Sequence, residues 1–351
     1  MLKAQFKKYI LKFKLPSGTS RGILTEKPSW FLKVFEDSSP DIFGIGECGP
    51  IKGLSRDPIY SFDEKMEELC EKINHHQNVD LKEFPSIQFG LEMALKDLEN
   101  KGDRTLFQNT FTKNEKNIKI NGLIWMGEFD FMSKQIQKKL EEGFRCIKVK
   151  IGSLKFKDEL NLLKQIRKNF KSTELELRVD ANGAYSNSNI SNVLSELAKL
   201  DIHSIEQPIS VNQWYDMKNL CKSSPIPIAL DEELIKPYTE KQKENLLQYI
   251  DPQYIVLKPS MLGGFKETEE WIDLAKKNNV GWWITSALES NVGLNAIAQF
   301  CGNFENKLPQ GLGTGGLYLN NFDSPLEITN QYLSLSKNKK WNLNPLIFND
   351  Y

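Results

Sequence analysis

The chain has 351 residues, of which 40% are hydrophobic and 26% charged, and its 46 basic and 46 acidic residues give a formal net charge of zero. A balanced charge provides no global field that would draw the protein to nucleic acid or to anionic lipid, so neither partner is expected. The apolar stretches are far too short to span a bilayer, and the N-terminus alternates lysine with apolar residues. We therefore expect a cytoplasmic protein without a secretory signal.

The first third of the sequence predicts an α+β domain. Alternating and helical hydrophobic patterns predict strands at 3–14, 30–37 and 43–50 and helices at 62–73 and 87–98. Between the first two strands, residues 16–29 accumulate Gly, Ser, Thr and Pro, which favours a mobile loop that acts as a lid, with a plain hairpin connection as the alternative. We assign residues 1–115 to this domain.

From residue 116 the pattern changes to alternating strand and helix. Eight apolar runs of strand length are separated by amphipathic segments: 118–124, 146–151, 175–180, 202–206, 227–231, 254–258, 281–285 and 308–312. This alternation predicts an α/β fold, a TIM-type parallel barrel at 116–321, and it places catalytic groups at the carboxyl ends of the strands. An open doubly wound sheet is the alternative, but no Gly-rich phosphate loop follows the first strand. The tail, 322–351, contains two strand-like runs that could return to the N-terminal domain.

The five cysteines are widely scattered and show neither a paired spacing nor a histidine spacing typical of zinc sites. They are Cys48, Cys70, Cys146, Cys221 and Cys301. We expect reduced, mostly packed thiols.

Five ionisable residues each end one of the apolar runs, at nearly regular intervals through the barrel. They are Lys150, Asp180, Glu206, Asp231 and Lys258. Side chains on a strand alternate between its two faces, so Lys148 shares a face with Lys150 while aliphatic residues occupy the other. An aliphatic face suits the surrounding helices, and the lysines and carboxylates should therefore point into the barrel.

Three of these residues, Asp180, Glu206 and Asp231, come from successive strands and should converge. Convergent carboxylates repel one another unless a cation bridges them, and an all-oxygen set favours magnesium, with manganese as a substitute. The alternative is that strand ends simply carry solvated acids. Lys150 and Lys258 would flank this triad, and a lysine close to other cations can act as a base. The pattern suggests proton abstraction from a carbon beside a carboxylate; for Lys258 a plain salt bridge is the alternative.

These motifs resemble the enolase superfamily over nearly the whole chain. The matching residues are the KxK of Lys148 to Lys150, DAN at Asp180 to Asn182, EQP at Glu206 to Pro208, DE at Asp231 and Glu232, and KP at Lys258 and Pro259. The resemblance implies a (β/α)7β barrel with an α+β capping domain, which the tail would join. It also implies Asp180, Glu206 and Asp231 as metal ligands, Lys150 as general base and Lys258 facing it. Lys148 would support Lys150 or the substrate carboxylate.

Within the superfamily, the mandelate racemase group is disfavoured because none of the three histidines lies late in the barrel. Dipeptide epimerases are disfavoured because 311–316 carries no acidic pair. The stretches 285–290 and 311–316 and the loop around Arg21 are most similar to o-succinylbenzoate synthases. This similarity implies a cytoplasmic, magnesium-dependent lyase of menaquinone biosynthesis that dehydrates a small anionic dicarboxylate through a metal-stabilised enediolate. An N-succinylamino acid racemase or another epimerase is the near alternative, and a non-catalytic binding barrel is the remote one.

The same stretches supply the expected substrate-binding residues. Hydroxyl groups and exposed backbone N–H groups at strand ends suit a second carboxylate, and an arginine in a lid could close over an anion. The candidates are Arg21, Asn182, Ser286, Leu288, Glu289, Gly313 and Thr314. For 311–316 the alternative is a tight strand-to-helix turn, and for Arg21 it is a solvated loop side chain.

Overall fold

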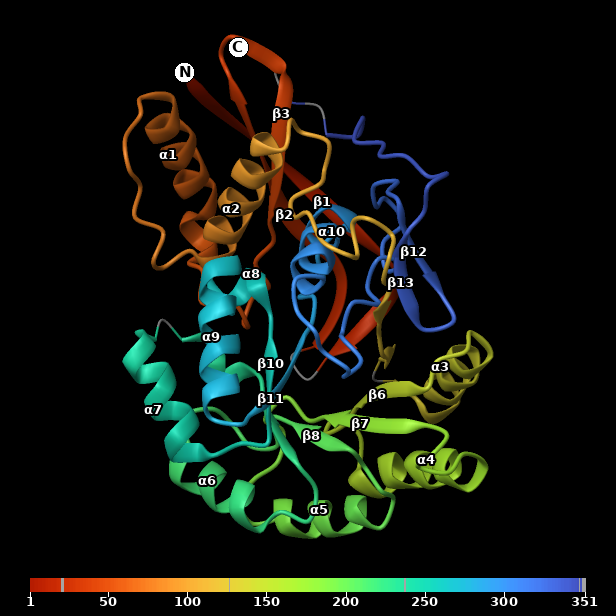
Figure 1. Cartoon of the computed structure of the whole chain (residues 1–351). Helices are drawn as coiled ribbons and strands as arrows, with labels where there is room; N and C mark the ends of the chain where they lie inside the picture. Colours follow the sequence, from red (N-terminus) through yellow and green to blue (C-terminus); the bar gives the residue numbers. More distant parts are fainter. Residues whose placement is uncertain (20–21, 126, 237, 347, 349–351) are drawn as a thin grey trace.

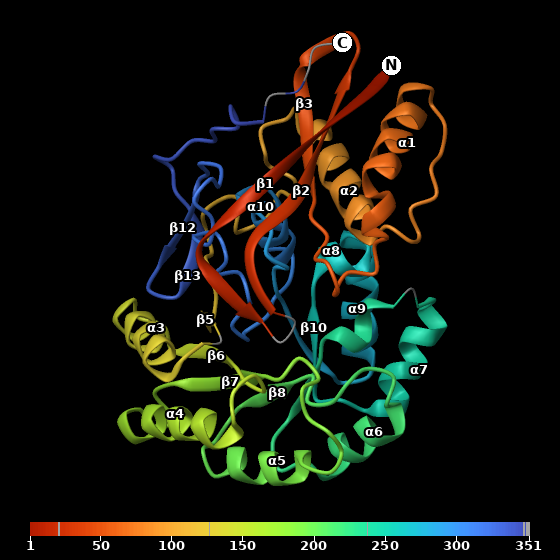
Figure 2. The same cartoon turned by 180° about the vertical axis from the view of Figure 1, so that it is seen from behind.

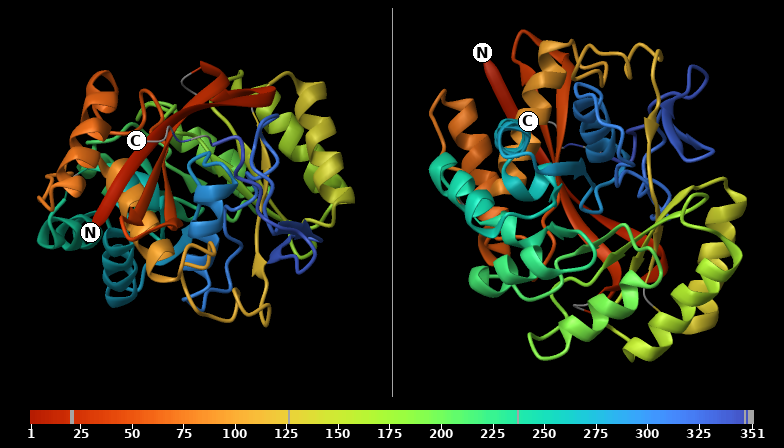
Figure 3. Two further views of the ribbon diagram at one scale, coloured as in Figure 1. Left: turned by 90° about the horizontal axis from the view of Figure 1, so that it is seen from above. Right: turned by 60° about the horizontal axis from the view of Figure 1, so that its bottom comes forward.

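The computed structural model describes residues 1–19, 22–125, 127–236, 238–346 and 348. An antiparallel sheet with two helices lies at one end of the molecule, and a curled parallel sheet with helices outside it lies at the other (Figure 1). The expected α/β barrel and its α+β companion are both confirmed. Further views show the helices of the parallel part on the outer side of its sheet (Figure 3).

The N-terminal sheet has the order β1 (Leu2–Thr19), β2 (Gly22–Glu36) and β3 (Ser39–Cys48). Alternate residues of β2, among them Trp30 and Leu32, pack against the helices α1 (Phe62–Asn74) and α2 (Pro85–Glu99), because period-two alternation places them on one face. Helix α2 approaches β3 so closely that a Cβ on Gly46 would lie 1.8 Å from the carbonyl oxygen of Gly90. Glycine is required there by space.

Residues 16–29 differ from the expected long loop. Most of them belong to β1 and β2, which pair antiparallel from Leu2 opposite Glu36 to Thr19 opposite Gly22, with a break in register between Lys12 and Ser17. Cross-strand pairing therefore outweighs the turn-rich composition. Arg21 lies outside the described residues. The hairpin reaches from the capping sheet down to the open end of the barrel (Figure 2).

The barrel consists of seven hydrogen-bonded parallel strands in sequential order. They are β5 (Gly122–Ile124), β6 (Cys146–Lys150), β7 (Glu176–Asp180), β8 (Ser204–Glu206), β9 (Ile228–Leu230), β10 (Tyr254–Leu257) and β11 (Gly281–Ile284). Amphipathic helices connect them: α3 (Phe129–Glu141), α4 (Phe156–Asn169), α5 (Ile190–Ala198), α6 (Trp214–Ser223), α7 (Glu240–Ile250), α9 (Phe265–Lys277) and α10 (Asn291–Cys301). Two short turns, the 3-10 helix Glu232–Ile235 and α8 (Pro259–Leu262), follow β9 and β10 directly.

The predicted eighth strand at 308–312 is reduced to two bridges that close the ring. Gln310 bridges Ile120 in parallel, and Gly311 bridges Thr285 in parallel. The backbone N–H of Gly311 donates to Ile284 O at 2.8 Å, and that of Gln310 donates to Lys119 O at 2.8 Å. This short segment therefore joins β11 to the start of the barrel.

The C-terminal tail forms the two expected strands, β12 (Leu326–Thr329) and β13 (Tyr332–Leu335), but their partner differs from the expectation. They pair with β4 (Ile118–Lys119), just before the barrel, and not with the N-terminal sheet. Contact with that sheet comes from Phe322, whose ring lies 5.3 Å from that of Tyr9 and 5.1 Å from that of Phe31. The tail thus packs on the N-terminal sheet without extending it.

The hairpin is held on the barrel by the segment that follows the ring closure. The Asn320 side chain accepts a hydrogen bond from Lys12 N at 2.8 Å and donates to Ile10 O at 2.8 Å. Backbone hydrogen bonds join Lys14 N to Leu317 O and Leu319 N to Lys12 O, both at 2.8 Å. The hairpin stem is therefore fixed, and its far end lies over the carboxyl ends of the barrel strands.

The cysteines and the lengths of the helices both bear on expectations from the sequence. All five cysteines are buried and free, which confirms the expected packed thiols. Within the part of the chain that the structure describes, no helix has the length and apolar character needed to cross a bilayer.

Phe322→Ala should destabilise the protein strongly, because Phe322 is 2% exposed and joins the tail to the N-terminal sheet. Truncating a buried phenylalanine costs about 3–5 kcal/mol of unfolding free energy. Urea denaturation measures this loss, with Leu319→Ala as a control because Leu319 is 69% exposed. Equal, small effects of the two variants would show that this contact does not hold the parts together.

Candidate active site

A cavity of about 150 Å³ lies at the carboxyl ends of the barrel strands, beneath the hairpin. Its walls come from both parts of the molecule. The N-terminal part contributes Gly22, Ile23, Leu24, Ile51, Lys52 and Leu54. The barrel contributes charged and polar groups at the floor, namely Lys148, Lys150, Asp180, Asn182 and Lys258, and largely apolar or small residues at the sides.

The register of the strands brings the charged residues together. Lys150 pairs in register with Asp180, which in turn pairs with Glu206, so three neighbouring strands end in charges that point into the barrel. The intervening Val149 and Val179 are buried on the other face, against the helices. This is the parity that the alternation of the sequence predicts.

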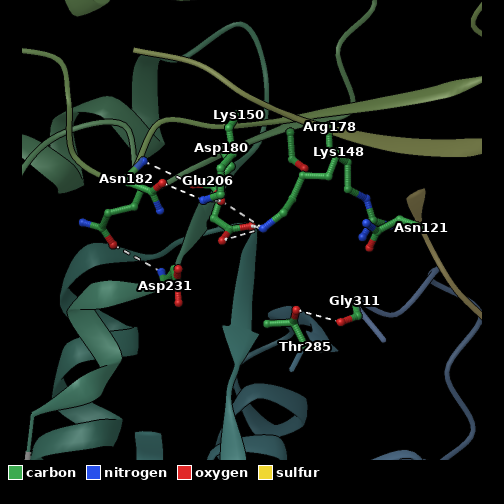
Figure 4. A network of polar contacts seen from close by, with 12 residues as sticks. Asn121, Lys148, Lys150, Arg178, Asp180, Asn182, Glu206, Asp231, Thr285 and Gly311 are labelled. Carbon is green, nitrogen blue, oxygen red and sulfur yellow. Dashed lines mark hydrogen bonds and ion pairs between the residues drawn. The ribbon is translucent and has the colours of Figure 1, made fainter. Parts of the chain in front are cut away.

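Lysines and carboxylates form one buried network at the cavity floor (Figure 4). Lys148 Nζ donates to Asp180 Oδ2 at 3.0 Å and to Glu206 Oε2 at 2.9 Å. Lys150 Nζ donates to Asp180 Oδ2 at 2.9 Å and to Asn182 Oδ1 at 2.7 Å. On the other side, Lys258 Nζ makes a short ion pair with Asp231 Oδ2. The ammonium groups thus stand between carboxylates that would otherwise repel one another.

The electrostatic balance differs between the two sides of the network. Burial opposes the charge on Asp180, but Lys148, Lys150 and Lys258 outweigh it and hold the pKa of its carboxyl far below the usual range. Burial likewise opposes the charge on Lys258, yet the nearby carboxylates raise the pKa of its ammonium. For Asp231, burial is the main cause of a raised pKa, and neighbouring carboxylates add to it. Of these two carboxylates, Asp231 is therefore the one whose charge the chain compensates less.

The donor chemistry fits a hard divalent cation. Asp180, Glu206 and Asp231 are each 1% exposed at the ends of adjacent strands, and Asp231 Oδ1 is buried without a hydrogen-bond partner. In the described residues, no three acidic, histidine or cysteine side chains surround a single point closely enough for coordination. Lysine ammonium groups lie between the carboxylates instead. A cation would therefore have to displace these ammonium contacts in order to bind.

Hydroxyl groups line another part of the cavity wall. Ser286 Oγ and Thr314 Oγ1 lie 2.6 Å apart and are both buried, and Thr285 Oγ1 donates to Gly311 O at 3.0 Å. Gly313 also borders the cavity. The predicted candidates Ser286, Gly313 and Thr314 therefore share one side of the cavity, where they could donate to an anionic group.

Two further candidates are held by unusual backbone geometry. Asn182 has φ +46° and Leu288 has φ +64°, conformations that residues with a Cβ adopt rarely. The Asn182 side chain bridges Lys150 and Glu232, donating to Glu232 Oε1 at 3.0 Å. The Leu288 side chain borders the cavity. Such strain is often found at binding sites, where surrounding contacts maintain it.

Some predicted residues do not line the cavity. Glu206 and Asp231 lie below its floor, buried under the lysines. Glu289 is fully buried and turned away from the cavity, because its carboxylate accepts hydrogen bonds from Ser260 Oγ and Ala287 N. A direct contact between Glu289 and substrate, as expected from the sequence, is therefore corrected to a supporting position behind the wall.

The sequence analysis missed several residues that line the cavity. Leu123 lies in the first barrel strand, Asn121 just before it and Trp125 just after it, and their period-two spacing could have revealed them. Lys52 approaches from a loop of the N-terminal part, where one lysine among many gives no sequence signal. Leu123 and Trp125 make the cavity more apolar at its sides than the motifs alone suggest.

Comparison with known proteins agrees with this geometry. A family model described as Enolase C-terminal domain-like matches residues 132–339, which is more than half of the chain. The o-succinylbenzoate synthase of Desulfotalea psychrophila is 43% identical over 369 residues, a match covering 95% of this chain and 99% of that protein. The chain belongs to the enolase superfamily. The resemblance drawn from the motifs is thereby confirmed.

Solved structures of the superfamily share the whole architecture. The crystal structure of MenC from Desulfotalea psychrophila LSv54 is 40% identical, with a TM-score of 0.85 and coverage of 95% of this chain and 99% of that chain. A dipeptide epimerase from Enterococcus faecalis, complexed with Mg and the dipeptide L-Leu-L-Tyr, has a TM-score of 0.81 at 17% identity, covering 97% and 98% of the two chains. The second likeness concerns the fold alone. Enolase-superfamily sites generally use a divalent metal with a lysine or histidine base.

Asp180→Asn should destabilise protein treated with chelator by about 3–5 kcal/mol near neutral pH, because it removes the negative charge with which two buried lysines pair. The pKa of Asp180 is lower in the folded chain than its unfolded value of about 3.9, so its stabilisation exists above that value and is lost on acidification. Urea unfolding over a range of acidic pH should thus show a flatter pH dependence for the variant.

Glu196→Gln provides the control for this experiment. Glu196 pairs with Lys199 on the surface, where an ion pair contributes little to stability. An equal loss of stability in both variants would contradict the role given to the buried network.

Proposed function

We propose that the chain is an o-succinylbenzoate synthase, a carbon–oxygen lyase that converts 2-succinyl-6-hydroxy-2,4-cyclohexadiene-1-carboxylate to 2-succinylbenzoate in menaquinone biosynthesis. The observation that carries this proposal is the full-length match to the Desulfotalea psychrophila o-succinylbenzoate synthase, at 43% identity. The cavity supports it, because opposed lysines at the floor and a hydroxyl-lined wall suit a dicarboxylate.

Lys150 would act as the base. Its Nζ lies at the cavity floor, held by Asp180 and Asn182, from where the neutral amine can take the proton on the carbon next to the ring carboxylate. The same proton can then be returned to the departing hydroxyl group. The C–H and C–O bonds break, a ring double bond forms, and water leaves, so a single residue on one face suffices for a syn elimination.

Lys258 would stabilise the negative charge that develops on the substrate. Lys258 follows the last residue of β10, across the floor from Lys150. The neighbouring carboxylates raise the pKa of its ammonium, so it would stay protonated during the reaction. An ammonium fixed in a buried site stabilises developing charge more than one in water does. Lys148 is buried between Asp180 and Glu206, and its main role would be to compensate their negative charge.

The metal we propose is magnesium, held by Asp180, Glu206 and Asp231, with manganese as a substitute. Its chemistry would be to place positive charge next to the substrate carboxylate, where electron density increases as the proton leaves. Asp231, with its unpartnered buried oxygen, is the ligand whose own environment most favours a cation. The Ser286 and Thr314 hydroxyls and Gly313 would receive the succinyl carboxylate at the opposite wall.

Purified protein with magnesium should convert the cyclohexadiene substrate, and the ultraviolet absorbance change on aromatisation measures the rate. Lys150→Ala should lower kcat by at least about a hundredfold, because removal of a general base costs that much. Chelator should abolish turnover, and magnesium should restore it. Absence of turnover, or turnover that neither chelator nor Lys150→Ala lowers, would refute the assignment.

An N-succinylamino acid racemase is the second candidate, because the two lysines lie on opposite sides of the floor and could each serve one face of a substrate. Racemisation needs a proton donor and acceptor on each face, whereas dehydration needs only a cation at Lys258. Lys258→Arg should therefore retain part of the dehydratase rate and abolish racemisation. Parallel assays by absorbance and by circular dichroism separate the two activities.

Equal loss of both reactions in Lys258→Arg would show that Lys258 acts as an acid or base in dehydration as well. The matched control is Lys155→Arg. Lys155 precedes α4 and does not line the cavity, so both activities should remain unchanged.

A further inference from the structure

A buried polar cluster, outside the residues given a catalytic role, connects the capping sheet to the wall of the cavity. It contains two carboxylates, an ammonium group and three hydroxyl groups, all at most 3% exposed: Lys27, Ser29, Glu47, Ser260, Glu289 and Ser290. Burial of so many polar groups is costly unless each is hydrogen-bonded in a defined geometry.

Glu47, near the end of β3, holds the N-terminus of α10. Its carboxylate accepts hydrogen bonds from Ser290 Oγ at 2.6 Å, from Ser290 N at 3.0 Å and from Gly293 N at 3.0 Å, and Ser29 Oγ donates to it at 3.0 Å. The first N–H groups of a helix lack partners within the helix and carry partial positive charge, so a carboxylate is stabilised there. Thus one residue of the capping sheet fixes where α10 begins.

Glu289 holds the wall from behind. Its Oε2 accepts from Ala287 N at 2.6 Å, and its Oε1 accepts from Ser260 Oγ at 2.5 Å. Ala287 is part of the cavity wall, while Ser260 belongs to α8, which begins directly after Lys258. A single buried carboxylate therefore connects the wall to the helix that follows one of the two opposed lysines.

Leu288 lies between these two anchors. Its backbone has φ +64°, its side chain borders the cavity, and its carbonyl accepts a hydrogen bond from Tyr318 OH at 2.6 Å. A leucine in this conformation is strained, and such strain persists only where the surroundings fix it. Glu289 and Ser290, the next two residues, supply these fixed points.

The charges of the cluster depend on one another. Lys27 Nζ lies 3.9 Å from Glu47 Oε1 and donates to Ser29 Oγ at 3.0 Å. Burial lowers the pKa of Lys27 and raises that of Glu289. Lys27 and Ser29 belong to β2, whose first residues line the cavity, so the cluster joins the hairpin, the wall and the helix after Lys258.

We propose that Glu47 and Glu289 are positioning residues for the reaction, Glu47 by fixing the cavity wall that contacts the substrate, and Glu289 by aligning Lys258 through Ser260. The proposal rests on the proposed function for its kinetic test. It assigns different effects to the two carboxylates: Glu47 governs substrate affinity, whereas Glu289, through Ser260, also governs the chemical step.

Glu47→Gln should raise KM about tenfold and leave kcat within about twofold, because the amide loses the charge and turns a donor toward the helix N-terminus. Asp97→Asn is the matched control. Asp97 is a buried carboxylate of the same capping part that accepts from Ile45 N at 2.9 Å and pairs with Arg104, without lining the cavity. Asp97→Asn should lower stability without changing KM.

Ser260→Ala should lower kcat about tenfold with KM within about twofold, because a displaced Lys258 ammonium affects the chemical step. Glu289→Gln should lower kcat to the same extent and also raise KM, because it weakens the hydrogen bond to Ala287 N of the wall. Ser29→Ala removes one donor to Glu47 and the acceptor of Lys27, and it serves where Glu47→Gln does not fold; it should also raise KM. Identical changes in KM and kcat for Glu47→Gln and Asp97→Asn, or an unchanged kcat in Ser260→Ala, would overturn the proposal.

Hydrogen–deuterium exchange provides a test that needs no substrate. Glu47→Gln should increase exchange at the amides of Ser290 and Gly293, and Glu289→Gln should do so at Ala287, whereas Asp97→Asn should affect neither site. If the wild type fails to turn over the cyclohexadiene but the exchange pattern is as expected, the proposed function fails while the anchoring stands. Unchanged exchange in both glutamate variants would refute the anchoring itself.

Discussion

The mutual compensation of buried lysines and carboxylates at the mouth of the barrel is the interaction on which the rest of the site depends. Each of these groups alone would be costly to bury, and each carboxylate would repel its neighbour across a strand pair. Side chains alternate along each strand, and the outer face carries the aliphatic residues that pack against the helices. The charged side chains therefore lie on the inner face. The fold and the charged floor therefore arise from one pattern.

This floor needs a cover, and the capping sheet provides it through close packing. Gly46 allows α2 to approach β3, and the following residue, Glu47, reaches the N-terminus of α10. The hairpin is held on the barrel by Asn320 and then extends over the strand ends. The capping part thus closes the cavity from a fixed position, and the contacts that fix it lie at the back of the wall.

The sequence predicts the barrel well where local and tertiary preferences agree, as at β6 and β7, whose charged residues fall on one face as expected. It fails at residues 16–29, where Gly, Ser, Thr and Pro favour a loop but antiparallel pairing with the rest of β1 determines the structure. It overestimates the length of the last strand. This segment contains Pro309, which has no N–H group to donate, and Gly311, and it forms only isolated bridges. The orientation of Glu289 depends on the hydroxyl group of Ser260 in α8, a contact that no local sequence pattern reveals.

The two regions of the cavity determine different aspects of the chemistry. On the proposed function, opposed lysines over an acidic floor determine the partial reaction, removal of a proton beside a carboxylate, for which the superfamily uses a lysine or histidine base with a divalent metal. We propose that the walls select the substrate; they combine the hydroxyls of Ser286 and Thr314 with apolar residues from the hairpin and from the first strand. Because the wall residues lie on other segments than the strand ends that carry the floor, the wall residues can be replaced while the charged network stays intact. On the proposed function, substrate choice can therefore vary within the family without loss of the lysines and carboxylates to which we assign proton abstraction.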